Sequence, residues 1–325
     1  MKNKISKGLL ILLSFLLVLS SSISIMAENS STIFLENKLD FGNAKTLSDK
    51  GENIICDLGN TQYVISKDAG DSISIQSDKY DYSIISSDES LRNAGINNDY
   101  VTFESDKYYK KRIEVNEFGL MNLNIINNEQ ATEIYKYEFE LPEGAYLKEL
   151  SLDGQSDGSI GIFDENNNYM DGFIVIQPTD SHKKLVPMNY YIDGNSIIQK
   201  VLHKDNMVSY PIETGIQTAS STSFSTYFQS SFWITRDSKL SLSVTIKDSG
   251  WQTSQGSVGM ALIISDSWNI LKNRHQSSSY WSNTNGMKDQ YECHANYAFN
   301  KRPWNLETWR PDVSYAATVA AGCNP

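Results

Sequence analysis

Cysteine is scarce in this sequence, with three residues in 325, and no two of them form a Cys-x-x-Cys pair. The sequence therefore carries no zinc signature, and we expect neither a metal nor a cofactor. Long apolar runs are missing after the first 27 residues, so the rest of the chain has no segment that would span a membrane. There is also no phosphate-binding glycine loop, no serine nucleophile elbow and no His-Glu-x-x-His motif.

Basic charge is in short supply as well. Lys plus Arg number 28 against 39 for Asp plus Glu, which gives a formal net charge of −11. Binding to nucleic acid needs basic side chains that neutralise phosphates, so the composition argues against a nucleic-acid partner. With 40% hydrophobic residues, the chain still has enough apolar material for one or two packed domains.

The first 27 residues have the pattern of a secretory signal peptide. Three lysines precede an apolar stretch from Leu9 to Leu19, and Ala27 supplies the small residue needed for cleavage. The apolar stretch is short for a membrane anchor. We therefore expect a secreted, extracellular protein that begins near residue 28.

Export to an oxidising compartment favours disulfide formation. Cys293 and Cys323 both lie within the last 33 residues, whereas Cys56 is far away. A Cys293–Cys323 bridge is the simplest pairing, and we expect Cys56 to be left free and buried.

Composition changes near residue 220. Residues 28–220 hold 16 basic and 32 acidic side chains, whereas residues 221–325 hold 9 and 7, and all six tryptophans follow residue 230. A Ser/Thr-rich stretch lies at the change. These features predict an acidic β-rich module at 28–218, a linker at 219–230 and a Trp-rich, disulfide-closed domain at 231–325. The charge difference would let the first part dock on the second, an attraction that salt screens.

The N-terminal module has the pattern of β structure. Apolar and polar residues alternate at 72–76, 135–141, 159–163, 173–176 and 195–202. Turns are expected at Asp153-Gly154, Asp157-Gly158 and Asp193-Gly194. No helical pattern of more than ten residues is evident. The predicted fold class is mostly β and β-sandwich-like.

The C-terminal part is predicted to be a small α+β domain. Alternating residues at 240–247 predict a strand that forms a hairpin with 232–234. Apolar residues at helical spacing predict one helix over 264–275, capped by Ser265 or Asp266, and another over 287–298. A last short helix is expected at 315–321, with Gly322 just past its end. An irregular Trp-rich segment should lie between Pro303 and Pro311.

Two strings carry a resemblance to known proteins. GMKDQYECHANYAF at 286–299 and WNLETWRPDVSYAATVAAGCNP at 304–325 resemble an uncharacterised domain at the C-termini of secreted proteins of Gram-positive bacteria and actinomycetes. The resemblance covers about 95 residues, from near Ser231 to Pro325. It implies secretion and the domain limits, and it implies no mechanism.

A second resemblance covers residues 137–211. Its pieces are YEFELPEG, GSIGIFDENN, an Asp-Gly-Asn turn followed by IIQKVLHK, and YPI at 210–212. They are similar to an N-terminal module of Gram-positive exported proteins, which precedes C-terminal domains of varied kind, antibacterial toxins among them. The acidic tail usual after YPI is reduced here to Glu213.

His294 is the candidate catalytic residue, because a histidine with an orienting carboxylate can act as a general base near neutral pH. Asp289 or Asp312 would be its partner. On a helix, Asp289 and His294 share a face only in part, so their direct pairing is doubtful. The favoured alternative is a structural histidine that hydrogen-bonds the short terminal loop.

Arg310 and four tryptophans are the candidate binding residues. Arg310, beside a rigid proline, could clamp a carboxylate or phosphate. The favoured alternative is an internal ion pair that ties the terminal segment to the helix containing Asp289 or Glu292. Trp281, Trp304 and Trp309, together with Trp251, could stack on sugar rings, or they could form the core of a small domain.

The stretch DENNNYMDG, residues 164–172, partly resembles a calcium loop. Tyr169 stands where that loop requires glycine, and Val175 where it requires an acid. A hairpin loop between 161–163 and 173–176 is therefore favoured.

Three hypotheses of function follow, the last of which is a plain extracellular structural protein. The first is a secreted effector of bacterial competition or envelope interaction, with its activity in the C-terminal domain. The alternative is a non-catalytic module that binds a cell-wall or other envelope glycan. The sequence does not decide whether the protein is an enzyme.

Overall fold

The computed structural model describes residues 44–325, apart from positions 59, 68–72, 78–79, 117–118, 153, 205, 219–222 and 252–258. The predicted signal peptide at 1–27 and the turn residue Asp153 lie outside the described residues. None of the helices in the described part of the chain is long and apolar enough to cross a membrane.

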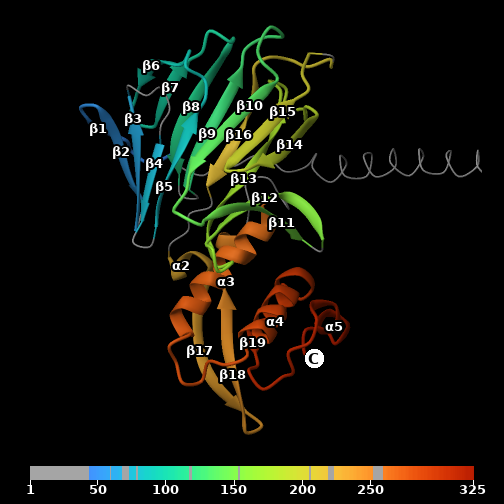
Figure 1. Ribbon diagram of the computed structural model, residues 1–325. Coiled ribbons are helices and arrows are strands. Elements are labelled where there is room, and N and C mark those ends of the chain that lie inside the picture. Colours follow the sequence, from blue (N-terminus) through green and yellow to red (C-terminus); the bar gives the residue numbers. More distant parts are fainter. Residues whose placement is uncertain are drawn as a thin grey trace, which may run out of the picture.

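Two eight-stranded antiparallel sheets form the N-terminal part, which confirms the predicted fold class (Figure 1). The first sheet contains, in order, β1 (Ser48–Lys50), β2 (Asn53–Leu58), β3 (Thr61–Ser66), β4 (Ile73–Ser77), β5 (Asp81–Ser86), β10 (Ile134–Glu140), β15 (Ser196–Val201) and β14 (Met188–Asp193). The second contains β11 (Tyr146–Leu152), β12 (Gln155–Phe163), β13 (Tyr169–Thr179), β16 (Ile212–Thr218), β9 (Gly119–Ile126), β8 (Tyr109–Asn116), β7 (Tyr100–Glu104) and β6 (Arg92–Ile96).

Alternation along each strand decides which side chains enter the core. In β3, Tyr63 and Ile65 are fully buried, whereas Gln62 and Val64 point to the other face and are half-buried. Inward-facing residues of both sheets belong to one hydrophobic cluster, so the sheets pack face to face as a sandwich. The Asp193-Gly194 turn is confirmed, since Gly194 has a φ of 56° between β14 and β15.

The C-terminal part has its own sheet and its own core. The sheet contains β17 (Phe228–Arg236), β18 (Lys239–Ile246) and β19 (Trp304–Leu306). Around it lie α2 (Phe224–Tyr227), the 3-10 turn η1 (Asp248–Trp251), α3 (Met260–His275), α4 (Thr284–Tyr297) and α5 (Tyr315–Ala320). A second hydrophobic cluster joins these elements. The predicted hairpin is confirmed, and its turn holds Asp237 and Ser238 at positive φ.

The structure corrects several local predictions. Helix α3 begins at Met260, well before the predicted caps Ser265 and Asp266, and Gly259 precedes it without a side-chain cap of its own. Asp157-Gly158 lies inside strand β12 and makes no turn. The segment between Pro303 and Pro311, predicted to be irregular, contains β19.

Helix α3 joins the two parts. The backbone N–H of Ala261 donates to Asp157 Oδ2 at 2.8 Å, and that of Leu262 donates to Ser159 Oγ at 3.3 Å. The sandwich thus supplies the cap that the helix lacks, which satisfies N–H groups at its first turn. Leu262 is fully buried against Ile174 of β13. Hydrogen bonds and apolar packing therefore hold α3 on β12 and β13 (Figure 1).

Candidate functional site

His294 lies on the inner face of α4. Its side chain is 2% exposed, and its ring stacks on Trp304 with 5.8 Å between centroids and 11° between planes. Burial, followed by the positive charge of Lys301, lowers the pKa of His294 to about 4. The ring is therefore neutral at pH 7, and its Nδ1 atom has no hydrogen-bond partner among the described residues. This geometry favours a packing role, although the expected hydrogen bond between His294 and the terminal loop is not found among the described residues.

The predicted carboxylate partners lie apart from that ring. Burial, followed by the negative charges of Glu292 and Asp312, raises the pKa of Asp289, so Asp289 and Asp312 influence each other. Asp312 is exposed in the segment before α5. Within the described part of the chain, neither carboxylate is hydrogen-bonded or ion-paired to His294, and no group of His, Cys, Asp and Glu is suited to hold a metal.

Arg310 fastens the end of the chain. Its Nε pairs with Glu307, and its Nη1 donates to the carbonyl oxygens of Asn324 at 3.0 Å and Pro325 at 2.8 Å. Asp289 and Glu292, the partners expected for an internal ion pair, are replaced here by the buried Glu307. Because these donors of Arg310 are bonded within the protein, the arrangement favours a structural role for Arg310 over an anion clamp.

The four candidate tryptophans differ in exposure. Trp251 and Trp304 are 4% and 0% exposed, and Trp281 is half-buried against Trp268. Trp309 is 42% exposed, with Lys239 Nζ 3.6 Å from its ring centroid. Strand β19 pairs with β18 and carries Trp304 into the core. The four rings therefore do not form a continuous exposed platform.

The predicted disulfide is confirmed. Cys293 on α4 is bonded to Cys323, just after α5, across a separation of 30 residues. Cys56 is free and buried, as expected. The hairpin loop predicted in place of a calcium site is also confirmed, because β12 and β13 pair on either side of residues 164–168. Asp164 Oδ1 accepts from the backbone N–H groups of Asn166 and Asn168 within that loop.

The sequence analysis did not predict a hydrogen-bonded pair formed by Ser231 and His275. Ser231 Oγ of β17 lies 2.7 Å from His275 Nε2 at the end of α3. Burial, followed by the charge of Arg274, lowers the pKa of His275, so the neutral ring can accept this hydrogen bond. The two residues are 44 positions apart. The pair ties β17 to α3.

A large pocket lies where α3 meets the sandwich, and we call it the α3 groove. Its volume is about 640 Å³, within the range typical of ligand sites. The sandwich contributes residues between Lys148 and Tyr169, α3 contributes residues between Ala261 and Lys272, and α4 and α5 supply the remainder. Both parts of the chain are therefore needed to form the groove.

Aromatic and amide side chains make up much of the lining of this groove. The aromatic residues are Phe163, Tyr169, Trp268 and Tyr315, and the amides are Asn167, Asn168, Asn269, Asn285 and Asn296. Asn296 donates to the Tyr315 hydroxyl at 2.8 Å, and Asn167 accepts from Tyr146 at 2.7 Å. The side chains of Asn269 and Asn285 make no hydrogen bond to another described residue, so their amides can bind a ligand.

Charged side chains of both signs complete the groove. Lys148, Lys272 and Lys288 line it together with Glu149 and Glu292. Lys288 and Glu292 form an ion pair of 3.3 Å along α4. The near balance of charge suits a neutral or zwitterionic ligand better than a polyanion.

Comparison with known proteins concerns the C-terminal part. Residues 228–325 match the family model of a protein of unknown function, DUF2599. Uncharacterised proteins of Mycobacterium bovis and Mycobacterium tuberculosis are 46% identical to the chain over 48 residues. That stretch is 14% of this chain and 32% of each relative. The chain thus spans about a third of the length of these relatives, and its C-terminal part is similar to a domain family that has no described activity.

Proposed function

We propose that this protein is an extracellular glycan-binding protein whose ligand lies in the α3 groove. The observation that carries the proposal is the lining of the groove, which includes aromatic rings and asparagine amides from both parts of the chain. Sugar rings have apolar C–H faces that pack on aromatic rings. Their hydroxyl rims donate and accept hydrogen bonds, and an amide can do both at once.

The expected export of the protein agrees with a cell-wall glycan as its ligand. The pattern of residues 1–27 favours export, and the Cys293–Cys323 disulfide is compatible with an oxidising compartment. A protein released outside a bacterial cell meets envelope polysaccharides at high local concentration. The proposed ligand is therefore a neutral or zwitterionic wall glycan.

Sedimentation with purified cell walls tests the proposal. The oxidised full-length protein is mixed with insoluble walls, and the bound fraction is measured for wild type and for an Asn269→Ala, Asn285→Ala double variant. Loss of two hydrogen bonds should weaken binding by about tenfold to a hundredfold. Neither side chain has a partner among the described residues, so the fold should be unaffected.

The matched control is Asn273→Ala, which removes an exposed asparagine of α3 outside the groove. Its binding should equal that of the wild type. Equal binding by the double variant and the control would contradict the proposal, and so would failure of the wild type to sediment with any wall preparation.

The effector hypothesis remains a second proposal. It is supported by the same groove, because α3, α4 and α5 contribute much of the lining. In that case the protein should inhibit growth of susceptible cells, and His294 with Asp289 or Asp312 would be the predicted chemical groups. A His294→Phe variant that inhibits as well as the wild type would exclude catalysis by His294.

A further inference from the structure

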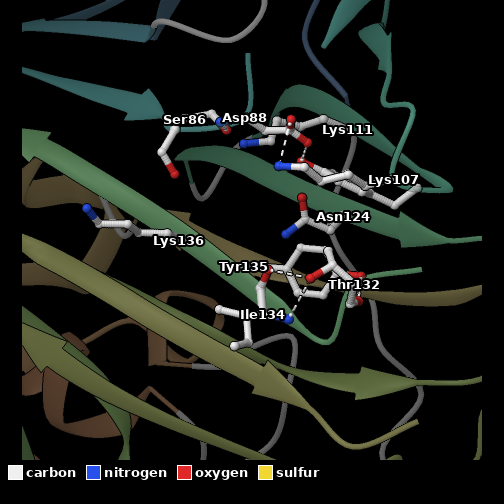
Figure 2. Close-up of a pocket in the computed structure, with 11 residues that line it drawn as sticks. Ser86, Asp88, Lys107, Lys111, Asn124, Thr132, Ile134, Tyr135 and Lys136 are labelled. Carbon is white, nitrogen blue, oxygen red and sulfur yellow. Dashed lines mark hydrogen bonds and ion pairs between the residues drawn. The ribbon is translucent and has the colours of Figure 1, made fainter. Parts of the chain in front are cut away.

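A second pocket lies within the sandwich, between β8 and β9 of one sheet and β10 of the other (Figure 2). Its volume is about 240 Å³, much smaller than that of the α3 groove. Neither the sequence patterns nor the proposed function involves this pocket.

The pocket is lined by polar residues at positions where the sandwich is otherwise apolar. On β8, Tyr109, Ile113 and Val115 face the core, and Lys111 faces the same way with 2% exposure. Asn124 of β9 is the cross-strand partner of Lys111 and is 1% exposed. The Lys111 ammonium lies 5.6 Å from the centroid of the Tyr137 ring. Burying the Asn124 amide in this layer is costly unless its polar atoms gain partners.

The amide of Asn124 is only half satisfied. Its Nδ2 donates to the Tyr137 hydroxyl at 2.6 Å, whereas its Oδ1 has no partner among the described residues. In Figure 2 this oxygen lies on the side of Lys107 and Lys111, and Tyr135 lies on the other side. An acceptor buried without a donor indicates a place for a hydrogen-bonding ligand.

Positive charge gathers at this pocket although the surrounding module is acidic. Lys107, Lys111 and Lys136 line it together with a single carboxylate, Asp88. Asp88 is already engaged, because it accepts from the hydroxyls of Tyr109 and Ser105 at 2.7 Å each and pairs with Lys107 at 3.0 Å. Lys136 pairs with Glu138, but both side chains are partly exposed, which makes that pair weak.

We propose that this pocket binds a small hydroxylated carboxylate of the sugar-acid class. The carboxylate would face the lysines, and a ligand hydroxyl would donate to Asn124 Oδ1. The buried ring of Tyr135 offers a surface for the C–H face of the ligand. This site is separate from the α3 groove, and the inference does not rest on the proposed function.

Calorimetric titration with sodium glucuronate tests the inference, with glucose and acetate as probes that lack the carboxylate and the hydroxyls respectively. The wild type should bind glucuronate at least tenfold more tightly than either probe. Asn124→Leu and Lys111→Met should each weaken glucuronate binding by roughly tenfold or more. Lys272→Met, a lysine substitution in the α3 groove, is the matched control and should bind like the wild type.

Loss of folding would not explain the expected result. Asn124→Leu removes a half-satisfied amide together with its hydrogen bond to the buried Tyr137 hydroxyl, so the melting temperature of the ligand-free variant is measured beside that of the wild type to show that the variant is folded. The inference is overturned if the wild type shows no heat of binding with glucuronate. It is equally overturned if Asn124→Leu binds glucuronate like the wild type, or if Lys272→Met loses binding to the same extent.

Discussion

At the scale of the residue, the most informative side chain is His294. The sequence offers it as a candidate base with a structural role as the favoured alternative, and in the fold its ring is enclosed between α4 and Trp304 and has a lowered pKa. A general base must reach a substrate proton, directly or through one water. Because His294 is buried and neutral, it instead affects the stability of the folded protein, and this effect depends on pH.

We expect the stability of the protein to fall as the pH drops from about 6.5 to 4. The folded pKa of His294 is about 4, against an ordinary value of 6.5. The unfolded chain therefore binds more protons in that window, and the stabilisation is complete above pH 6.5 and lost as the pH approaches 4. The full effect corresponds to at most roughly 3 kcal/mol.

Thermal unfolding of wild type and His294→Phe between pH 4 and 7 measures this effect. Phenylalanine keeps a ring against Trp304 and removes the titrating group, so the variant should lose part of the acid sensitivity. His182→Phe alters an exposed histidine and serves as the control. Identical pH profiles for wild type and His294→Phe would show that another group causes the acid sensitivity.

Arg310 is a second side chain whose role depends on its contacts in the fold. An arginine flanked by tryptophan and proline has the appearance of an anion clamp in the sequence. In the folded chain its donors serve Glu307 and two carbonyl oxygens at the C-terminus. The planar, many-donor guanidinium suits this task, which a lysine ammonium could perform only in part.

At the scale of the element, α3 carries the connection between the sandwich and the C-terminal part. It has 16 residues and no cap within its own sequence. Asp157, which lies 104 positions before Ala261, accepts the N–H of that residue. Gly172 of β13 leaves room for the helix, because a Cβ there would overlap Leu262 and the carbonyl of Ile160.

Asp157→Ala should loosen α3 and lower the stability by about 1 kcal/mol, the usual value of a helix cap. Hydrogen exchange should accelerate at the start of α3 and leave β3 and β8 unchanged. Glu165→Ala, which alters an exposed loop carboxylate, is the control. Unchanged exchange in α3 of the Asp157→Ala variant would contradict the role given to this contact.

Local patterns predicted most elements, and the exceptions have physical reasons. Strands such as β18 and helices such as α4 follow the period of their apolar residues, so the sequence indicates them directly. The start of α3 was missed because its cap comes from another part of the chain. Strand β19 was missed because its three residues are specified by pairing with β18 rather than by a period of their own.

At the scale of the whole molecule, the α3 groove was beyond sequence reasoning. Its lining comes from the sandwich between 148 and 169 and from three helices that follow residue 259. No local pattern brings Tyr169, Asn269 and Asn285 together, because only the docking of α3 does so. Of the tryptophans that could form either a sugar platform or a core, Trp251 and Trp304 are buried in the core, whereas Trp268, which lies in the predicted helix at 264–275, lines the groove.

Blocking the groove tests the central claim most directly. Ser265 lines it, is half-buried and makes no side-chain hydrogen bond to another described residue. Ser265→Trp would fill the groove and remove no existing contact. Asn273→Trp, on the same helix outside the groove, is the control.

The measurement is a calorimetric titration of both variants and the wild type with a soluble oligosaccharide released from the walls that the protein sediments with. We predict that Ser265→Trp abolishes binding at an unchanged melting temperature, whereas Asn273→Trp binds like the wild type. Full affinity in a folded Ser265→Trp variant would contradict the account.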